Sequence, residues 1–256
     1  MLDARRFLGR LSYDAAEMGT AQTERQAKAG RRRPWTGDQN VFMYRFACYV
    51  TGLLLRFWVR RYRVYGAENV PTTGGLYVIA NHTSGLDPFL LAYPLCRHGI
   101  RGPGKIELFK NPVVGWVMKR LGIFPLRQGT TDPVGVRTMV SLYRAGQIVI
   151  VYPEGGRSPD GSLRPFRPEF ARLVIKMRAR VLPAAIAGAP DVLPIGSLMP
   201  RSNTPVAVVY GEPFELSEYY AVNLTDEVAM QAAADLQSRV AELLERARRE
   251  RDAASR

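Results

Sequence analysis

Cysteine and histidine are scarce in this chain of 256 residues, which contains two of each. Cys48 and Cys96 lie in dissimilar sequence contexts, so they offer neither a disulfide framework nor the ligand spacing of a zinc site. A chain of this length can bury a substantial core and does not need disulfides. We therefore expect no bound metal ion, and a reducing, cytoplasmic setting is the simpler inference.

Long apolar runs are also missing. The most apolar stretch is a predicted helix from 41 to about 60, in which only about ten uncharged residues separate Arg45 from Arg56. A membrane span needs ~20 predominantly apolar residues. The stretch is therefore predicted to lie at a membrane interface, with its apolar face in the acyl boundary and its arginines on lipid phosphates. The alternative is a helix that packs on the core of the same domain.

Acidic residues are few in the first quarter of the chain, and the whole protein carries a net charge of +13. Such a charge indicates an acidic partner, which is a nucleic acid, an anionic membrane or a phosphorylated substrate. No zinc-finger spacing, aromatic RNA-binding strand or basic zipper favours a nucleic acid. Residues 1 to about 30 suit a helix, without the features of a secretory signal. We therefore predict a basic, helical membrane-docking region at 1–61 and no nucleic-acid partner.

From Tyr62 onward, short β-rich runs alternate with helical patterns. This alternation predicts an α/β fold with a mainly parallel central sheet covered by helices. The predicted strands are 62–65, 76–80, 123–126, 148–152, 181–186 and 206–210. The predicted helices are 88–96, 112–121, 133–144, 169–179 and 225 to about 251, and three of them open on a proline.

A histidine and an aspartate follow the second predicted strand. His82 lies on a strand-to-helix turn, and Asp87 precedes the proline that opens the next helix. Such turns, at the carboxyl ends of strands, are where open α/β sheets bind ligands. His82 can accept a proton from an alcohol while Asp87 orients its imidazole. The alternative makes Asp87 a helix N-cap and His82 a polar turn residue. Ser84 has no Gly-x-Ser-x-Gly elbow around it, so a serine nucleophile is disfavoured.

The stretch 151–158 is a second strand that ends in a turn. Gly155 and Gly156 let backbone amides approach an anion, and Arg157 offers a planar fork to phosphate oxygens. Glu154 has three possible roles, which are to orient Arg157, to hold a substrate hydroxyl or to pair with a neighbouring arginine. This turn therefore predicts a phosphate site.

Two further basic residues stand near a third strand. Arg127 follows the strand 123–126, and Lys105 precedes it in the chain. Each cation alone is more typical of a solvated surface. Because several strand ends carry a base, arginines and glycines, we predict that they form one anion-binding site.

These motifs together resemble the 1-acyl-sn-glycerol-3-phosphate acyltransferases and their glycerolipid acyltransferase relatives. The resemblance covers roughly residues 62–212 and rests on blocks in the family's order: Asn81-His-Thr-Ser-Gly-Leu-Asp-Pro88, Gly122-Ile-Phe-Pro-Leu-Arg127, Tyr152-Pro-Glu-Gly-Gly-Arg-Ser158 and the apolar 181–186, with Lys105-Ile-Glu-Leu-Phe-Lys-Asn-Pro112 ahead of the second. Three positions depart from the family's pattern. Tyr152 and Gly156 stand for its usual phenylalanine and threonine, and Glu169 stands for a common glycine.

The resemblance implies a catalytic domain at 62–256 in which His82 and Asp87 form the catalytic dyad. It implies that Arg127 and Arg157, with Lys105, hold the acceptor's phosphate. The implied reaction moves a fatty acyl group from acyl-CoA or acyl-carrier protein, as cosubstrate, to the free hydroxyl of lysophosphatidic acid, and no other cofactor is implied. The enzyme would work at an anionic membrane surface, on the cytoplasmic face, as a peripheral or monotopic protein. The alternatives are an acceptor such as glycerol-3-phosphate or another lysophospholipid, or a non-catalytic basic protein that binds membranes or nucleic acid.

Overall fold

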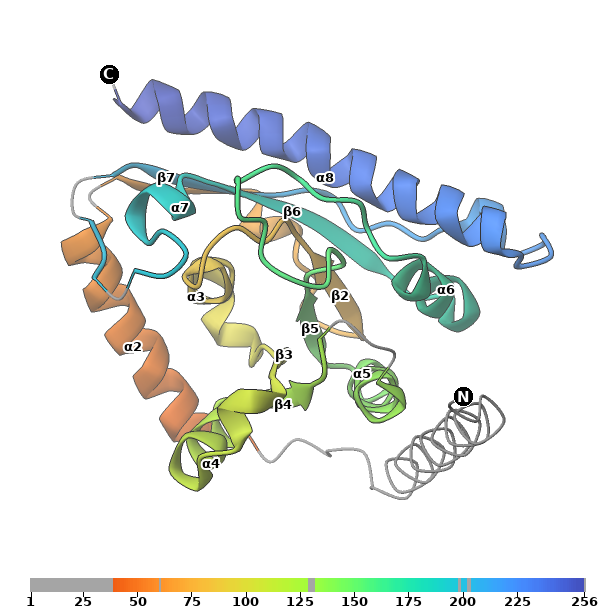
Figure 1. The fold of residues 1–256 in the computed structure, drawn as a ribbon, viewed down its shortest axis with the longest axis horizontal. Coiled ribbons are helices and arrows are strands. Elements are labelled where there is room, and N and C mark those ends of the chain that lie inside the picture. The colour runs from red at the N-terminus through yellow and green to blue at the C-terminus, as the bar shows by residue number, and fades with distance from the viewer. Residues whose placement is uncertain (1–38, 60, 129–131, 198, 202–203, 256) are drawn as a thin grey trace, which may run out of the picture.

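Five strands form the central sheet, in the order β1–β7–β6–β2–β5 (Figure 1). The computed structural model describes residues 39–59, 61–128, 132–197, 199–201 and 204–255. Neighbouring strands are parallel except for β6 and β7, which are antiparallel. The α/β fold with a mainly parallel sheet is therefore confirmed. The strands are β1 (Tyr62–Tyr65), β2 (Leu76–Ile79), β5 (Ile148–Val151), β6 (Val181–Ala187) and β7 (Val206–Tyr210).

A smaller parallel sheet of two strands, β3 (Gly102–Lys105) and β4 (Ile123–Leu126), lies beyond the β5 edge. It is attached there by an isolated bridge between Arg101 and Val149. The Arg101 N–H donates to the Ile148 carbonyl, and the Ile150 N–H donates to the Arg101 carbonyl, both at 2.9 Å. β3 was not predicted, because its Gly-Pro-Gly start has little strand propensity of its own and the strand depends on its partner.

The longer helices agree with the predicted ones to within a few residues and several open on a proline, whereas α7 and most of the 3-10 helices were not predicted. Asn111 caps α4 and Asp132 caps α5, each by accepting two backbone N–H groups of the first turn. The helices are α2 (Val41–Trp58), α3 (Asp87–Ala92), α4 (Pro112–Arg120), α5 (Pro133–Arg144), α6 (Pro168–Met177), α7 (Ala189–Val192) and α8 (Asp226–Ser255). The 3-10 helices are η1 (Ala67–Asn69), η2 (Tyr93–His98), η3 (Ile106–Phe109) and η4 (Ser217–Tyr219).

The central sheet is covered on both faces. Along β2, Leu76 and Val78 pack into a cluster with α2 and α3, whereas Tyr77 and Ile79 pack into a cluster with α5, α6 and α8. This alternation follows from the two-residue period of a strand. α8 lies along β6 and β7 (Figure 1), and its own apolar face is buried there. β2 is thus buried on both sides, which fixes the position of the turn that follows it.

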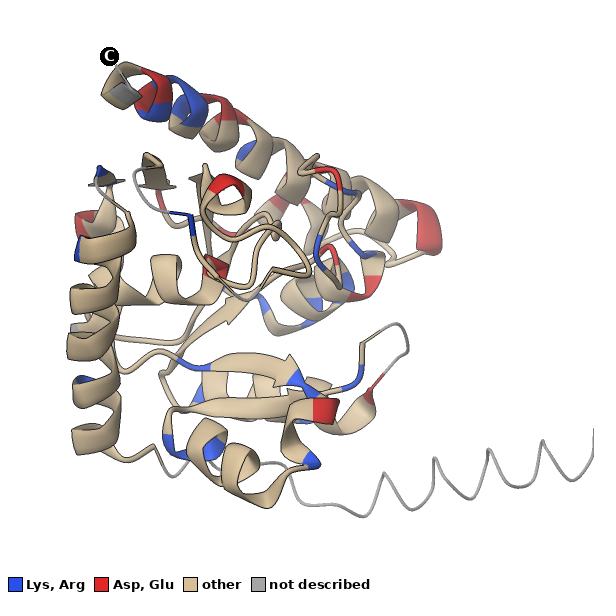
Figure 2. Ribbon diagram, turned by 60° about the vertical axis from the view of Figure 1, so that its left-hand side comes forward, with Lys and Arg blue, Asp and Glu red and all other residues tan. Residues whose placement is uncertain are grey.

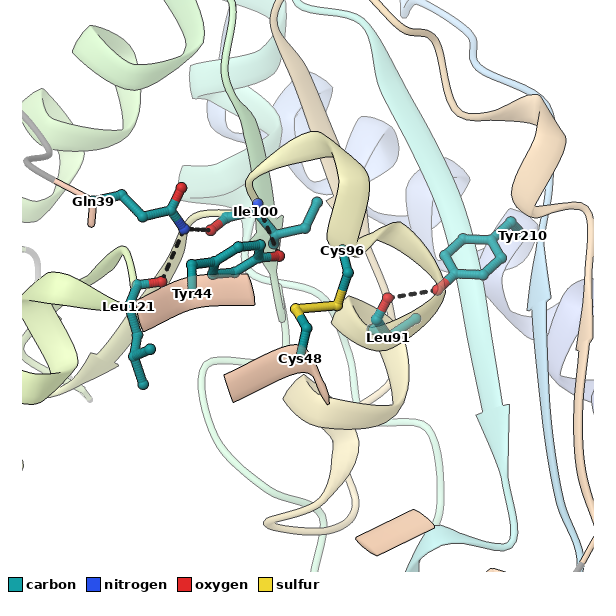
Figure 3. Close-up of a disulfide and its surroundings, with 8 residues drawn as sticks. All are labelled: Gln39, Tyr44, Cys48, Leu91, Cys96, Ile100, Leu121 and Tyr210. Atoms are coloured by element: carbon teal, nitrogen blue, oxygen red, sulfur yellow. Dashed lines mark hydrogen bonds between the residues drawn. A yellow bond between two sulfur atoms is a disulfide. The ribbon is translucent and has the colours of Figure 1, made fainter. Parts of the chain in front are cut away.

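α2 is joined to the segment after α3 by a disulfide between Cys48 and Cys96, whose Cα atoms are 6.2 Å apart (Figure 3). The sequence-based expectation of two unpaired cysteines was therefore wrong. A separation of 48 residues gives no pairing signal, because α2 and η2 meet only in the folded chain. The inference of a reducing compartment rested on free thiols, so the disulfide removes its support.

α2 is also tied to the smaller sheet and its helix. The Gln39 side-chain amide donates to the carbonyls of Ile100 and Leu121, and the Ile100 N–H donates to the Tyr44 hydroxyl (Figure 3). Among the described residues, no helix is both long and apolar enough to cross a membrane. The helix predicted within 1–30 lies outside the described residues, and the domain boundary near 61 stays a prediction.

Candidate active site

Two neighbouring parallel strands, β2 and β5, end side by side. The turns that follow them carry most of the predicted site residues. Ile79 pairs with Val151 in the β2–β5 ladder, and the Ala80 N–H donates to the Val151 carbonyl. His82 stands three residues after β2, and Tyr152 comes directly after β5. The carboxyl-end placement predicted for both turns is therefore observed.

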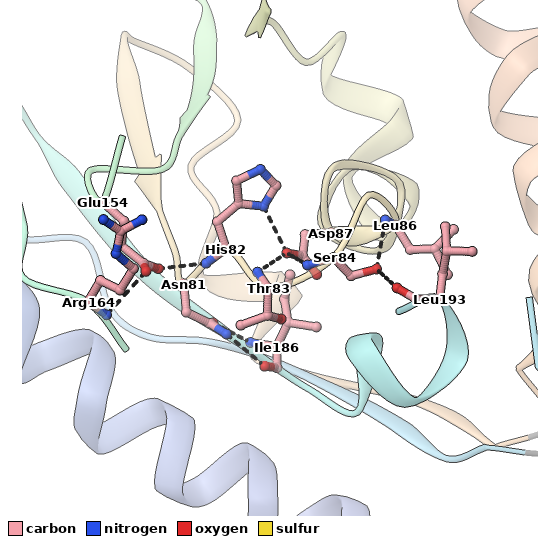
Figure 4. A network of polar contacts seen from close by, with 10 residues as sticks. All are labelled: Asn81, His82, Thr83, Ser84, Leu86, Asp87, Glu154, Arg164, Ile186 and Leu193. Carbon is pink, nitrogen blue, oxygen red and sulfur yellow. Dashed lines mark hydrogen bonds and ion pairs between the residues drawn. The ribbon is translucent and has the colours of Figure 1, made fainter. Parts of the chain in front are cut away.

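His82 and Asp87 are in contact as predicted. The His82 Nδ1 lies 2.9 Å from the Asp87 Oδ2 (Figure 4). The Asp87 side chain is fully buried and that of His82 is 13% exposed. A carboxylate at Nδ1 favours the tautomer with its proton there, which leaves Nε2 as the acceptor. The pair therefore has the geometry of a base with its orienting carboxylate.

The same Asp87 oxygen is held by the turn in front of it. The Thr83 and Ser84 N–H groups donate to Oδ2 at 2.6 and 2.8 Å. The alternative in which Asp87 caps its helix is wrong, because Asp87 is the first residue of α3 and the N-cap is Leu86, without a side-chain bond. The Ser84 hydroxyl donates to the Leu193 carbonyl, so it is used structurally.

Glu154 connects the two turns (Figure 4). Its carboxylate accepts the backbone N–H of His82 at 2.7 Å and that of Arg164 at 3.1 Å. Burial raises the pKa of the Glu154 carboxyl, whereas the two N–H bonds act in the opposite direction. Its side chain does not line the cavity described below. Among the described residues Glu154 forms no ion pair with Arg157 or another arginine, because its hydrogen-bond partners are backbone amides, and its predicted role at a substrate hydroxyl stays a prediction.

Tyr152 stacks on the His82 ring. The ring centroids are 4.1 Å apart and the planes differ by 16°. Burial, followed by the nearby Asp87 charge, raises the pKa of the Tyr152 hydroxyl well above its usual value. The imidazole is therefore fixed by a carboxylate at one nitrogen and by an aromatic ring on one face.

A cavity of about 560 Å³ opens beside His82. Four basic residues line it, and they come from two parts of the fold: Lys105 and Arg127 at the ends of β3 and β4, and Arg157 and Arg167 before and at the start of α6. Gly155 and Gly156 line it as well. The cavity thus brings together His82 and the three predicted cations. A site for an anionic molecule with a reactive hydroxyl requires such a combination of a base and cations.

Gly155 does not have the predicted role. Its N–H donates to the Tyr152 carbonyl at 3.0 Å within the turn, so it is not directed at an anion. The glycine has a φ of +75°, in the left-handed region that favours glycine. The predicted pairing of glycine amides with phosphate therefore does not apply at this position.

Two residues that help to form the cavity were not predicted. Asp132 accepts the Arg127 N–H at 3.0 Å, besides capping α5, and so holds the turn after β4. Arg167 precedes α6 and its N–H donates to the Pro153 carbonyl at 2.9 Å. The sequence signal for Arg167 was its position two residues before the predicted helix 169–179, where a side chain can face the same loops as Arg157.

Comparison with known proteins agrees with this fold and site. Residues 61–187 match the family model described as acyltransferase, and they include both His82 and Arg157. The crystal structure of the 1-acyl-sn-glycerophosphate (LPA) acyltransferase from Thermotoga maritima superposes with a TM-score of 0.58 and 27% sequence identity, over 72% of each chain. Residues 61–187 therefore form a domain of the acyltransferase family.

Within this family, the chain is similar to proteins named 1-acyl-sn-glycerol-3-phosphate acyltransferase. A chloroplastic relative from Brassica napus is 30% identical over 155 residues, which are 59% of this chain and 44% of that protein. A relative from Bacillus subtilis is 24% identical over 181 residues, which are 71% of this chain and 87% of that protein. The match thus spans less than half of the plant protein and most of the bacterial one. The resemblance inferred from the motifs is confirmed.

Proposed function

We propose that the protein transfers a fatty acyl group to the free hydroxyl of 1-acylglycerol-3-phosphate, which gives phosphatidic acid. The observation that carries this proposal is the His82–Asp87 contact of 2.9 Å at a cavity lined by Lys105, Arg127 and Arg157. A phosphate monoester carries about two negative charges at neutral pH, and arginine and lysine are its usual ligands. The names of the relatives from B. napus and B. subtilis support the same acceptor.

In the proposed reaction, His82 Nε2 takes the proton of the acceptor hydroxyl as the hydroxyl oxygen attacks the thioester carbonyl carbon. The tetrahedral intermediate then collapses, the carbon–sulfur bond breaks, and the leaving thiolate takes the proton back from His82. Asp87 stabilises the charged imidazole between these steps. The arginines hold the phosphate so that the hydroxyl reaches His82, which is a positioning effect. Acyl-CoA and acyl-carrier protein both present the required thioester.

The acceptor can be tested directly with purified protein and labelled acyl-CoA. We expect kcat/KM to be at least roughly 10-fold higher for lysophosphatidic acid than for glycerol-3-phosphate or lysophosphatidylcholine, because the cavity cations match a phosphate monoester on a lipid. A parallel series with acyl-carrier protein identifies the donor. A preference for glycerol-3-phosphate or for a larger head group would replace the proposed acceptor.

We also propose that α2 docks the protein on an anionic membrane surface. Five large apolar side chains lie on one exposed face of this helix, with exposed fractions from 40% to 79%: Phe42, Phe46, Tyr49, Leu53 and Phe57. Their spacing of three or four residues keeps them together. Charged residues are few along α2 (Figure 2), and those of the helix are Arg45 and Arg56. An apolar face with flanking arginines fits the boundary between headgroups and acyl chains.

Further apolar side chains are exposed on α4, whose C-terminal end contacts the residue that precedes α2. The Asn40 N–H donates to the Arg120 carbonyl at the end of α4, and α4 exposes Val113 and Trp116. We therefore place the acceptor and the product at the lipid surface, on the cytoplasmic face, with the protein bound peripherally. The thioester donor of the proposed reaction supports the cytoplasmic face, and the cysteines do not.

Membrane docking predicts a loss of vesicle binding when the apolar face is made polar. Changing Phe42, Phe46 and Phe57 together to serine should weaken binding to phosphatidylglycerol-containing vesicles by roughly three powers of ten or more, because each phenylalanine loses ~1.5–3 kcal/mol of apolar burial. Sedimentation with vesicles measures this. A matched control is Met230→Ser on α8, where the methionine is 53% exposed. Equal binding of the triple variant and the control would contradict docking through α2.

A further inference from the structure

Arg167 is a cavity-lining cation to which the proposed reaction gives no role. It stands at the N-cap position of α6, and its N–H donates to the Pro153 carbonyl at 2.9 Å. This bond fixes the Arg167 backbone to the turn that carries Arg157. Both arginines line the cavity that His82 faces. Arg167 therefore approaches the same space as Arg157, from the neighbouring segment of chain.

The side chain of Arg167 crosses directly over Gly155. A Cβ atom added at Gly155 would stand 2.1 Å from the Arg167 Nε and 2.7 Å from its Cζ. Contacts under 3.0 Å do not occur for real Cβ atoms, so any side chain at 155 would displace the guanidinium. The absence of a side chain at Gly155 therefore suits both its φ of +75° and the close approach of Arg167.

Within the described ranges, the ion pairs do not include Arg157 or Arg167. Glu169, in the first turn of α6, also lines the cavity but forms no ion pair with either. Two guanidinium groups held on connected segments without a carboxylate are suited to bind an anion, and each can donate two parallel hydrogen bonds.

We propose that Arg167 is a specificity-determining residue that binds the acceptor's phosphate together with Arg157, and that the glycine at 155 admits the Arg167 side chain as well as adopting its φ of +75°. The inference rests on the proposed function, in which this cavity takes a phosphorylated acceptor. A phosphate monoester carries up to two negative charges, whereas a phosphodiester carries one. Arg167 therefore favours monoester acceptors over lysophospholipids whose phosphate bears a second substituent.

Binding is tested apart from turnover in a His82→Ala background, with inorganic phosphate and lysophosphatidic acid as probes in calorimetry. Adding Arg167→Ala should raise both dissociation constants by roughly 10–100-fold, as expected for a lost hydrogen bond between charged groups. Arg167→Lys should recover part of the affinity. Arg144→Ala, an exposed arginine in the last turn of α5, is the matched control and should leave both constants unchanged.

Kinetics in the otherwise unchanged protein test the specificity. Arg167→Ala should raise the acceptor KM with little change in kcat or in the donor KM. The loss of kcat/KM should be larger for lysophosphatidic acid than for lysophosphatidylglycerol. Equal losses for the two acceptors, or a change confined to the donor KM, would overturn the role of Arg167 in monoester selection.

The Gly155 part of the inference predicts coupling between the two positions. Gly155→Ala should weaken phosphate binding about as much as Arg167→Ala, and the double variant should be no weaker than either one. Gly161→Ala is the control for backbone strain, because Gly161 also has a φ of +75° but has no atom within 4 Å of the added Cβ. Additive effects at 155 and 167 would overturn the contact as the reason for the glycine.

These outcomes separate the inference from the proposed function. A protein that binds phosphate through Arg167 but does not acylate lysophosphatidic acid would retain the anion site and lose the proposed reaction. Acylation without any effect of Arg167→Ala on phosphate affinity would retain the reaction and overturn the inference. Failure of the His82→Ala protein to bind either probe would also overturn it.

Discussion

Turnover should fall by roughly 10²–10⁴-fold when His82 is replaced by alanine, which is the range that a positioned general base contributes. The reason is that the acceptor hydroxyl then loses the only imidazole described at the cavity. The acceptor KM should change little, since the cavity cations remain. Transfer of labelled acyl groups from acyl-CoA to lysophosphatidic acid measures the loss, and circular dichroism shows whether the fold is retained.

The chain provides its own controls for this experiment. His98→Ala changes the other histidine and should leave turnover near that of the unchanged protein. Asp87→Asn should also reduce turnover strongly, because an amide at that position no longer fixes the proton on Nδ1. Since the two residues act as one unit, the double variant should be no slower than His82→Ala alone. Undiminished transfer by His82→Ala would end the assignment of the base.

Removing the disulfide should have the largest effect on stability. The Cys48–Cys96 bond closes a loop with a sequence separation of 48 residues. The loop-closure estimate for such a length is about 4 kcal/mol of unfolding free energy. For a protein of this size, that corresponds to a decrease in Tm of roughly 8–16 °C. Thermal unfolding of the Cys48→Ser/Cys96→Ser protein measures the change.

Reductant gives an independent form of the same experiment. The unchanged protein should lose thermal stability in dithiothreitol, while the double-serine protein, which has no thiols, should not respond. Mass spectrometry without reductant, after alkylation, shows directly whether the two thiols are bonded. Free thiols in the native protein, or equal Tm values with and without reductant, would contradict the bond.

The sequence predicted those parts of the fold whose local pattern agrees with their final environment. β5 and β6 are apolar, rich in aliphatic residues and buried throughout, so their composition alone predicted them. β3 was missed because two of its residues are glycines and one is a proline. These residues form a half-buried strand only because they pair with β4 and lie next to the bridge at the β5 edge. The strand 206–210 was predicted as well, but its antiparallel pairing with β6 and the disulfide were not predictable, since each depends on contacts between distant segments.

The site was predictable in its residue types and less so in their partners. His82 and Asp87 lie five residues apart on one turn, so their contact follows from local geometry. Glu154 was assigned to substrate or arginine, because a sequence does not show that its carboxylate reaches the His82 amide across 72 positions. Arg167 was missed for the same reason. The role proposed for it depends on the close approach of its side chain to Gly155, which only the fold reveals.

The separation between the two sheets has a consequence for the choice of acceptor. His82 and Arg157 follow strands of the larger sheet, whereas Lys105 and Arg127 end the smaller one. The ladders of the two sheets meet at a single bridge, between Arg101 and Val149. Because the cavity is lined from both sheets, the position of Lys105 and Arg127 relative to His82 depends on how the smaller sheet is held, at this bridge and through the bonds of Gln39 and Tyr44 to Ile100 and Leu121.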